Sequence, residues 1–145
     1  MKHLSYILIS ALILLSACTE SVDNAARQDQ LPKIFPDYIG VTIPENIAPM
    51  NFCVDDNIEK IDVTVRGSNG GEMHVQDDYA DFDIDEWHSI VSQNKGGKLT
   101  FSVCVKKGGQ WLRYNDFTMT VSQYDMPDYA LTYRRIAPGY EVYSK

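Results

Sequence analysis

The chain has 145 residues, of which 44% are hydrophobic and 23% are charged, and its formal net charge is −7. This length suits one domain, and the composition is that of a globular protein rather than a collagen-like, coiled-coil or broadly disordered chain. An acidic chain without a basic run is also a poor candidate for binding nucleic acid.

The N-terminus has the layout of a secretory signal peptide. Lys2 precedes a run over residues 6–15 that is apolar apart from Ser10, and the small residues Ser16 and Ala17 follow. A positive charge, a short apolar run and small residues in this order are typical of a cleaved signal. The run is too short to span a bilayer, which needs about 20 apolar residues.

The end of this segment carries a more specific motif, Leu15-Ser16-Ala17-Cys18. It resembles the lipobox of bacterial lipoproteins, in which the cysteine thiol receives a diacylglycerol and the signal is cut before the cysteine. The resemblance implies that residues 1–17 are removed and that Cys18 anchors the protein in the membrane. Thr19, where an Asp usually marks inner-membrane retention in enterobacterial lipoproteins, resembles the outer-membrane class. Whether the domain is periplasmic or surface-exposed stays open.

Composition divides the rest of the chain into two parts. Residues 18–31 are polar and lack strand alternation, which predicts a flexible tether or, alternatively, a short frayed helix. From residue 32 onward, short β-type runs alternate with turn residues, so we predict one folded domain over residues 32–145.

Most of this domain is predicted to be β-structure. Apolar and polar residues alternate in several short runs, as in half-buried strands, and Asn69-Gly70 favours a tight hairpin. The predicted strands cover residues 47–54, 61–66, 72–76, 99–106, 111–114, 117–121 and 131–136.

One segment, residues 84–94, has helical periodicity instead. Asp83 is placed to cap its N-terminus, with Glu86 three residues later, and Phe82 and Trp87 suit a hydrophobic staple. Several short strands with a single helix predict a two-layer β-sandwich, immunoglobulin- or fibronectin-like, with one short α-helix. A lone antiparallel sheet packed on the helix is the alternative.

The strongest candidate for a metal site is Asp81-x-Asp83-x-Asp85, which matches the opening of a calcium loop. The match ends at Glu86, where the loop needs glycine, and at Ser92, where it needs a bidentate glutamate. The sequence therefore favours helix capping by these carboxylates, and we expect no metal and no cofactor. No nucleophile, nucleotide or redox motif is present, so we expect a protein that is not an enzyme.

Two cysteines lie in the predicted domain, and an oxidising envelope makes a Cys53–Cys104 disulfide possible. Strand alternation places both side chains on outward faces, away from Phe52 and Phe101. They could therefore bond only across neighbouring strands of one sheet or through a bulge, and otherwise both thiols should be partly accessible.

Aromatic residues concentrate in the last third of the chain, among them Trp111, Tyr114, Tyr124 and Tyr129. Exposed aromatic rings could stack on sugars or anchor a protein partner, whereas buried ones would simply pack. The sequence thus leaves open an envelope-protein partner, a glycan partner in a carbohydrate-binding accessory domain, and ordinary packing.

Two segments carry a family resemblance, IFPDYIGVTIPENIAPMNF over residues 34–52 and DYALTYRRIAPGYEVYSK over residues 128–145. They resemble the N-terminal module of Gram-negative envelope lipoproteins that continue into a TolB-like β-propeller with Pro-Asp-type repeats. The resemblance transfers no catalytic residue. Our first hypothesis is therefore a non-catalytic, lipid-anchored module that binds or presents something at the cell envelope. Residue 145 lies about where such a propeller would begin, so the sequence is either a fragment or a module that stands alone.

Overall fold

The structure is a computed structural model that describes residues 20–54 and 57–124. These residues form two-residue strands, longer strands and one helix. In chain order the elements are β1 (Ala26–Arg27), β2 (Ile34–Phe35), β3 (Thr42–Ile43), β4 (Cys53–Val54), β5 (Lys60–Gly67), β6 (Glu72–Asp77), α2 (Ile84–Gln93), β7 (Lys98–Lys107), β8 (Gln110–Arg113) and β9 (Phe117–Val121).

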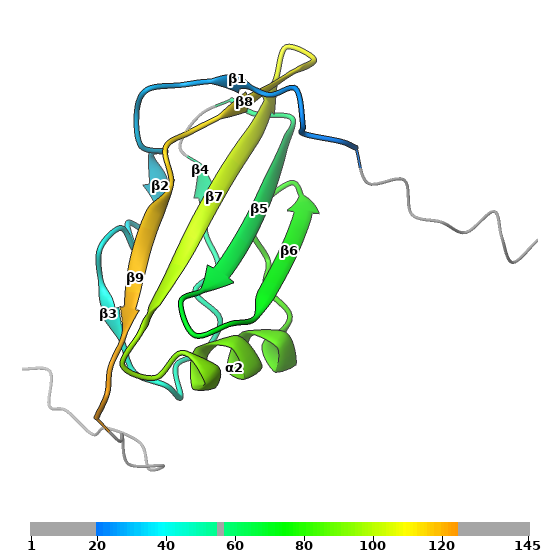
Figure 1. The fold of residues 1–145 in the computed structure, drawn as a ribbon. Helices are drawn as coiled ribbons and strands as arrows, with labels where there is room; N and C mark the ends of the chain where they lie inside the picture. The colour runs from blue at the N-terminus through cyan, green and yellow to red at the C-terminus, as the bar shows by residue number, and fades with distance from the viewer. Residues whose placement is uncertain (1–19, 55–56, 125–145) are drawn as a thin grey trace, which may run out of the picture.

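Strand β7 is the centre of a seven-stranded sheet. One side of β7 pairs antiparallel with β5 along its length, and β6 follows beyond β5. The other side is shared, since β8 pairs with one half of β7 and β9 with the other half. The short strands β1 and β3 then extend the sheet by parallel pairing with β8 and β9, as Figure 1 shows.

The second layer consists of the two-stranded sheet β2–β4 and the chain around it. Phe52, just before β4, contacts Phe101 of β7 and Phe117 of β9, with ring centroids 6.5 and 6.1 Å apart. Helix α2 lies across the end of the β5–β6 hairpin (Figure 1). The mainly β, two-layer architecture with one helix is therefore as the sequence predicts, and among the described residues the second layer has two strands.

The alternation of the sequence explains which face of the sheet is buried. On β5, Ile61, Val63 and Val65 are fully buried and face the second layer. The core-facing residues of β7 are fully buried in the same way, so one continuous apolar surface joins the two strands. Burying such surface contributes roughly 25 cal/mol per Å², which makes this face the main source of stability.

Helix α2 begins where the capping pattern predicts. The Asp83 carboxylate accepts hydrogen bonds from the backbone N–H groups of Asp85 and Glu86, each at 3.0 Å. The Phe82 ring stacks on the Trp87 ring at 5.4 Å, as expected for a hydrophobic staple. Capping is therefore confirmed as the role of Asp83, and the helix ends at Gln93 with Asn94 as its C-cap.

Two predicted strands differ in the structure or lie outside it. Of residues 47–54, only Cys53–Val54 forms a strand. The Ile47 carbonyl instead accepts a hydrogen bond from the Trp87 indole at 3.1 Å, so this stretch serves the contact between layers. The predicted strand over residues 131–136 and the predicted signal over residues 1–17 lie outside the described residues.

Candidate functional site

The face of the main sheet that points away from the second layer carries a row of polar side chains. Strand register places Gln76, Asp62, Cys104, Arg113 and Arg27 directly beside one another, in that order, across β6, β5, β7, β8 and β1. Directly opposed residues share a face of a sheet, so the row lies entirely on this outer face. Basic groups occupy one end of the row, and a carboxylate lies near its middle.

Asp62 is a buried charged residue of the row, with 3% of its surface exposed. One oxygen, Oδ2, accepts a hydrogen bond from Gln76 Nε2 at 2.8 Å and lies 2.8 Å from His74 Nε2. A buried carboxylate is tolerated when it is hydrogen-bonded in this way. Gln76 and His74 therefore provide hydrogen-bond partners for the buried Asp62 carboxylate, and His74 has a structural role here.

Cys104, beside Asp62, is on the predicted outward face but is 5% exposed. Burial, with a further contribution from the Asp62 charge, raises the pKa of its thiol to about 11. The prediction that an unbonded Cys104 is partly accessible is therefore wrong: the thiol faces outward between Asp62 and Arg113 and is nevertheless buried. A protonated, covered thiol is also poorly suited to nucleophilic chemistry.

Cys53 and Cys104 are both free thiols, so the possible disulfide is not formed. Cys53 is exposed on β4 and its thiol lies 3.4 Å from the Phe35 carbonyl oxygen, which accepts its hydrogen bond. The reason is topological, since β4 packs against the core face of β7 whereas Cys104 lies on the opposite face.

These positions predict different thiol reactivities. Near pH 8, a thiol reagent should modify Cys53 in the native protein and Cys104 only after denaturation. The raised pKa also predicts a pH dependence of stability, because the folded protein favours the protonated thiol of Cys104. The stabilisation from burying this protonated thiol is complete below about pH 9 and is lost as the pH rises toward the folded-state pKa of about 11. Mass spectrometry of the alkylated peptides measures the first effect, and rapid native labelling of Cys104 would contradict the assignment.

The N-terminal segment (residues 20–31) also contacts the outer face. The backbone of Glu20 exchanges two hydrogen bonds with the Gln76 side chain, both at 2.8 Å. Its carboxylate lies 2.6 Å from Lys106 Nζ and 3.6 Å from Lys60 Nζ. The hydrogen bond from Lys106 is the main reason that the pKa of Glu20 is lowered.

Further along, the same segment joins the edge of the sheet. Ala26 and Arg27 form β1 beside β8, the Gln28 N–H donates to the Arg113 carbonyl at 2.8 Å, and the Asn115 N–H donates to the Gln30 carbonyl at 2.9 Å. The structure therefore differs from the prediction of a flexible tether. The polar residues of this segment form hydrogen bonds and ion pairs with the polar outer face of the sheet. The segment can therefore pack on the sheet although it has no apolar stripe.

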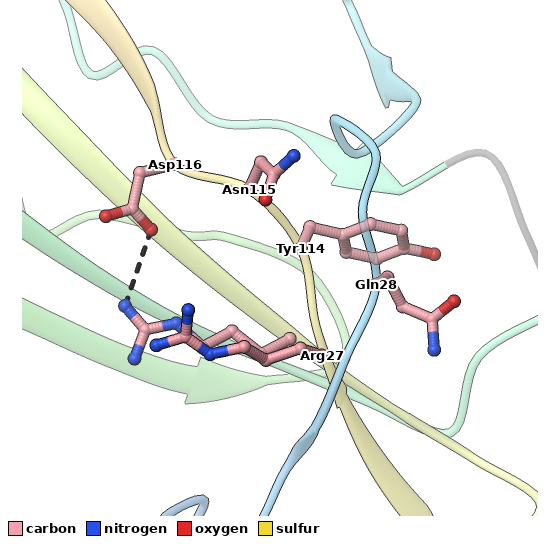
Figure 2. Close-up of a pocket in the computed structure, with 6 residues that line it drawn as sticks. Arg27, Gln28, Tyr114, Asn115 and Asp116 are labelled. Atoms are coloured by element: carbon pink, nitrogen blue, oxygen red, sulfur yellow. Dashed lines mark hydrogen bonds and ion pairs between the residues drawn. The ribbon is translucent and has the colours of Figure 1, made fainter.

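Where the N-terminal segment meets β8, it forms a pocket of about 190 Å³. Figure 2 shows the residues that line it: Arg27, Gln28, Arg113, Tyr114, Asn115 and Asp116. Two of these residues belong to β1 and the position after it, and the other four belong to the end of β8 and the turn into β9.

Two arginines dominate the electrostatics of this pocket. Arg27 and Arg113 are Cα partners in the parallel β1–β8 pair, so their side chains leave the same face side by side. Arg113 Nη2 lies 3.5 Å from Asp116 Oδ1, the dashed contact in Figure 2. The Arg27 guanidinium has no hydrogen-bond or ion-pair partner within residues 20–54 and 57–124.

The described residues of the predicted aromatic surface, Trp111, Tyr114 and Tyr124, do not form one surface. Trp111 is half-buried on the outer face, Tyr114 is 8% exposed in the core, and Tyr124 is 72% exposed. Tyr124 follows β9, which pairs with Lys98–Phe101, whereas Trp111 lies on β8, which pairs with Cys104–Lys107 at the opposite end of β7. Tyr129 lies outside the described residues. The structure thus provides no shared platform for three of the four rings.

The sequence alone does not reveal the arginine pair. Alternation from Leu112 places Arg113 on an outer face, but nothing in the two residues of β1 signals that they pair with β8.

Within the described part of the chain, no helix is long and apolar enough to cross a membrane, and no group of three or more residues is arranged to hold a metal ion.

Comparisons with known proteins add no relative. No family model matches the chain, and neither the curated proteins nor the solved structures contain a significant match.

Proposed function

We propose that this chain is a lipid-anchored, non-catalytic binding or presentation module of the bacterial outer membrane, attached through Cys18. The motif of residues 15–18, directly after a short apolar run with a positive flank, carries the proposal. An acyl chain contributes about 0.8 kcal/mol per buried methylene, so two or three chains on one cysteine would hold the module stably.

The position of Glu20 adds a geometric expectation to this proposal. Glu20 contacts the sheet through Gln76, Lys106 and Lys60, and it follows Cys18 by two residues. Two residues of chain span at most about 7 Å. An anchored Cys18 would therefore keep this end of the outer face close to the membrane surface, with no long spacer between them.

The non-catalytic part of the proposal rests on how the reactive side chains are used. Cys104 is buried with a raised pKa, and His74 is engaged with Asp62. Neither lies in the pocket between β1 and β8, whose lining is suited to binding rather than to proton or acyl transfer. The scattered aromatic residues give the carbohydrate-binding alternative no support.

Kinship with the N-terminal module of TolB-like propeller lipoproteins is part of the proposal. It rests on the two segments that carry the resemblance, residues 34–52 and 128–145. An open reading frame that continues past codon 145 into propeller repeats would support it, and a stop codon directly after codon 145 would make the module a protein of its own.

Replacing Cys18 tests the anchoring. In bacteria fed radiolabelled palmitate, the wild-type protein should be labelled, and it should stay with the membranes through a high-salt wash. Cys18→Ala should be unlabelled and should accumulate as uncut precursor or as soluble protein, because only the thiol can form the thioether. Cys53→Ala is the matched control and should behave as the wild type.

Two outcomes would contradict the proposal. One is labelled, membrane-bound protein of mature size from the Cys18→Ala variant. The other is a Cys53→Ala variant that loses its label to the same extent, which would show that the loss follows from any cysteine substitution.

A further inference from the structure

We infer that the pocket between β1 and β8 is a binding site for a phosphate group, held by Arg27 and Arg113. The inference names a ligand class for the binding role proposed above. It rests on the described geometry and is independent of whether Cys18 carries lipid.

The two neighbouring arginines repel one another. Like charges placed directly opposite one another on neighbouring strands are destabilising. Here the register fixes Arg27 beside Arg113. An anion between the two guanidinium groups would remove this repulsion, so the arrangement favours an anionic ligand. The chain has a net charge of −7, so two adjacent positive charges stand out against its overall negative charge.

Within the described residues, Asp116 is the one carboxylate that pairs with either arginine. Asp116 reaches only Arg113, at 3.5 Å, and both side chains are about two-fifths exposed. An exposed pair at this distance is weak. Arg27 keeps its five N–H donors unpaired within the described residues, and Arg113 keeps most of its own. The site therefore has more donor capacity than Asp116 uses.

The chemistry of the donors favours phosphate over a carboxylate. Guanidinium groups bind phosphate oxygens through two parallel N–H donors, and two adjacent guanidinium groups can engage different oxygens of one phosphate. A phosphate monoester carries about 1.5 to 2 negative charges near neutral pH, so it can engage both arginines at once, whereas Asp116 contacts only Arg113. A carboxylate carries one charge and would duplicate what Asp116 provides.

The construction of the pocket supports a specific site over a diffuse charged surface. Backbone hydrogen bonds of 2.8 and 2.9 Å, from Gln28 to Arg113 and from Asn115 to Gln30, hold its two walls together. The backbone that carries each arginine is thus fixed before a ligand arrives, which lowers the entropic cost of binding.

The experiment is a calorimetric titration of the full chain in non-ionic detergent micelles. Inorganic phosphate is one probe, and micelles containing phosphatidate, a lipid with a phosphomonoester headgroup, are the other. We expect saturable binding of at least one probe, weakened about tenfold or more by Arg27→Gln and by Arg113→Gln. Binding of phosphate alone would identify a soluble ligand, and markedly tighter binding of phosphatidate would identify a lipid headgroup.

Arg66→Gln is the matched control. Arg66 is also an exposed arginine of the outer face, but it is paired with Glu72 at 2.6 Å and lies on β5, away from the pocket. It should leave both affinities unchanged. The inference is overturned if neither probe gives saturable heat, or if Arg66→Gln weakens binding as much as the pocket variants. Failure here leaves the palmitate result unaffected, so the two proposals fail separately.

Discussion

Replacing Trp87 with alanine should lower the free energy of unfolding by about 3–5 kcal/mol. The side chain is fully buried, its ring stacks on Phe82 at 5.4 Å, and its Nε1 donates to the Ile47 carbonyl at 3.1 Å. The substitution would leave a cavity where helix α2, the main sheet and the second layer meet. It would also remove the partner of a backbone carbonyl, so both losses act in the same direction.

Urea denaturation followed by far-ultraviolet circular dichroism measures the effect. Ile84→Ala is the control on the same helix, because Ile84 is 53% exposed and its loss should change stability by about 0.5 kcal/mol or less. Equal effects of the two substitutions would show that Trp87 is not a core residue.

Gly67→Ala should cost about 3 kcal/mol, which is a large effect for one added methyl group. A Cβ on Gly67 would lie 2.0 Å from Asn94 Nδ2 and 2.3 Å from the Gly70 carbonyl oxygen. Asn94 cannot move aside without loss, because its fully buried side chain donates to the carbonyls of Gly70 and Ile90 and accepts from the Asn69 N–H. The clash therefore falls on the link between helix α2 and the β5–β6 hairpin.

Gly108→Asn separates this clash from the general effect of removing a glycine. Gly108 has a φ of +58°, which asparagine tolerates, and open space around its Cβ position. We expect a change in the free energy of unfolding within about 0.5 kcal/mol for this control. If Gly67→Ala were as mild as Gly108→Asn in the same urea titration, the close packing of Asn94 against Gly67 would be refuted.

The parts of the fold that the sequence predicts correctly are those decided by neighbouring residues. The alternation over residues 61–66 and 99–106 assigns β5 and β7 and their core faces. Asp83 and its flanking aromatic residues likewise define the start of α2. Each of these signals lies within a few residues of the structure that it specifies, so no tertiary information is needed.

The parts that could not be predicted depend on long-range pairing. Strand β1 is two residues long and pairs with β8, more than eighty positions further along the chain, without any alternation to reveal it. That pairing creates the Arg27–Arg113 pocket and docks the N-terminal segment. The burial of Cys104 is also a tertiary effect. Strand alternation correctly places its side chain on the outer face, but its exposure depends on which residues lie around it on that face.

The central claim is tested most directly by mass spectrometry of the N-terminal peptide from protein purified out of the cell envelope. The account predicts a peptide that begins at Cys18, with a diacylglyceryl thioether on its sulfur and an acyl group on its α-amine. A peptide that spans Ala17 and Cys18, or one that begins at Cys18 with an unmodified thiol, would contradict it.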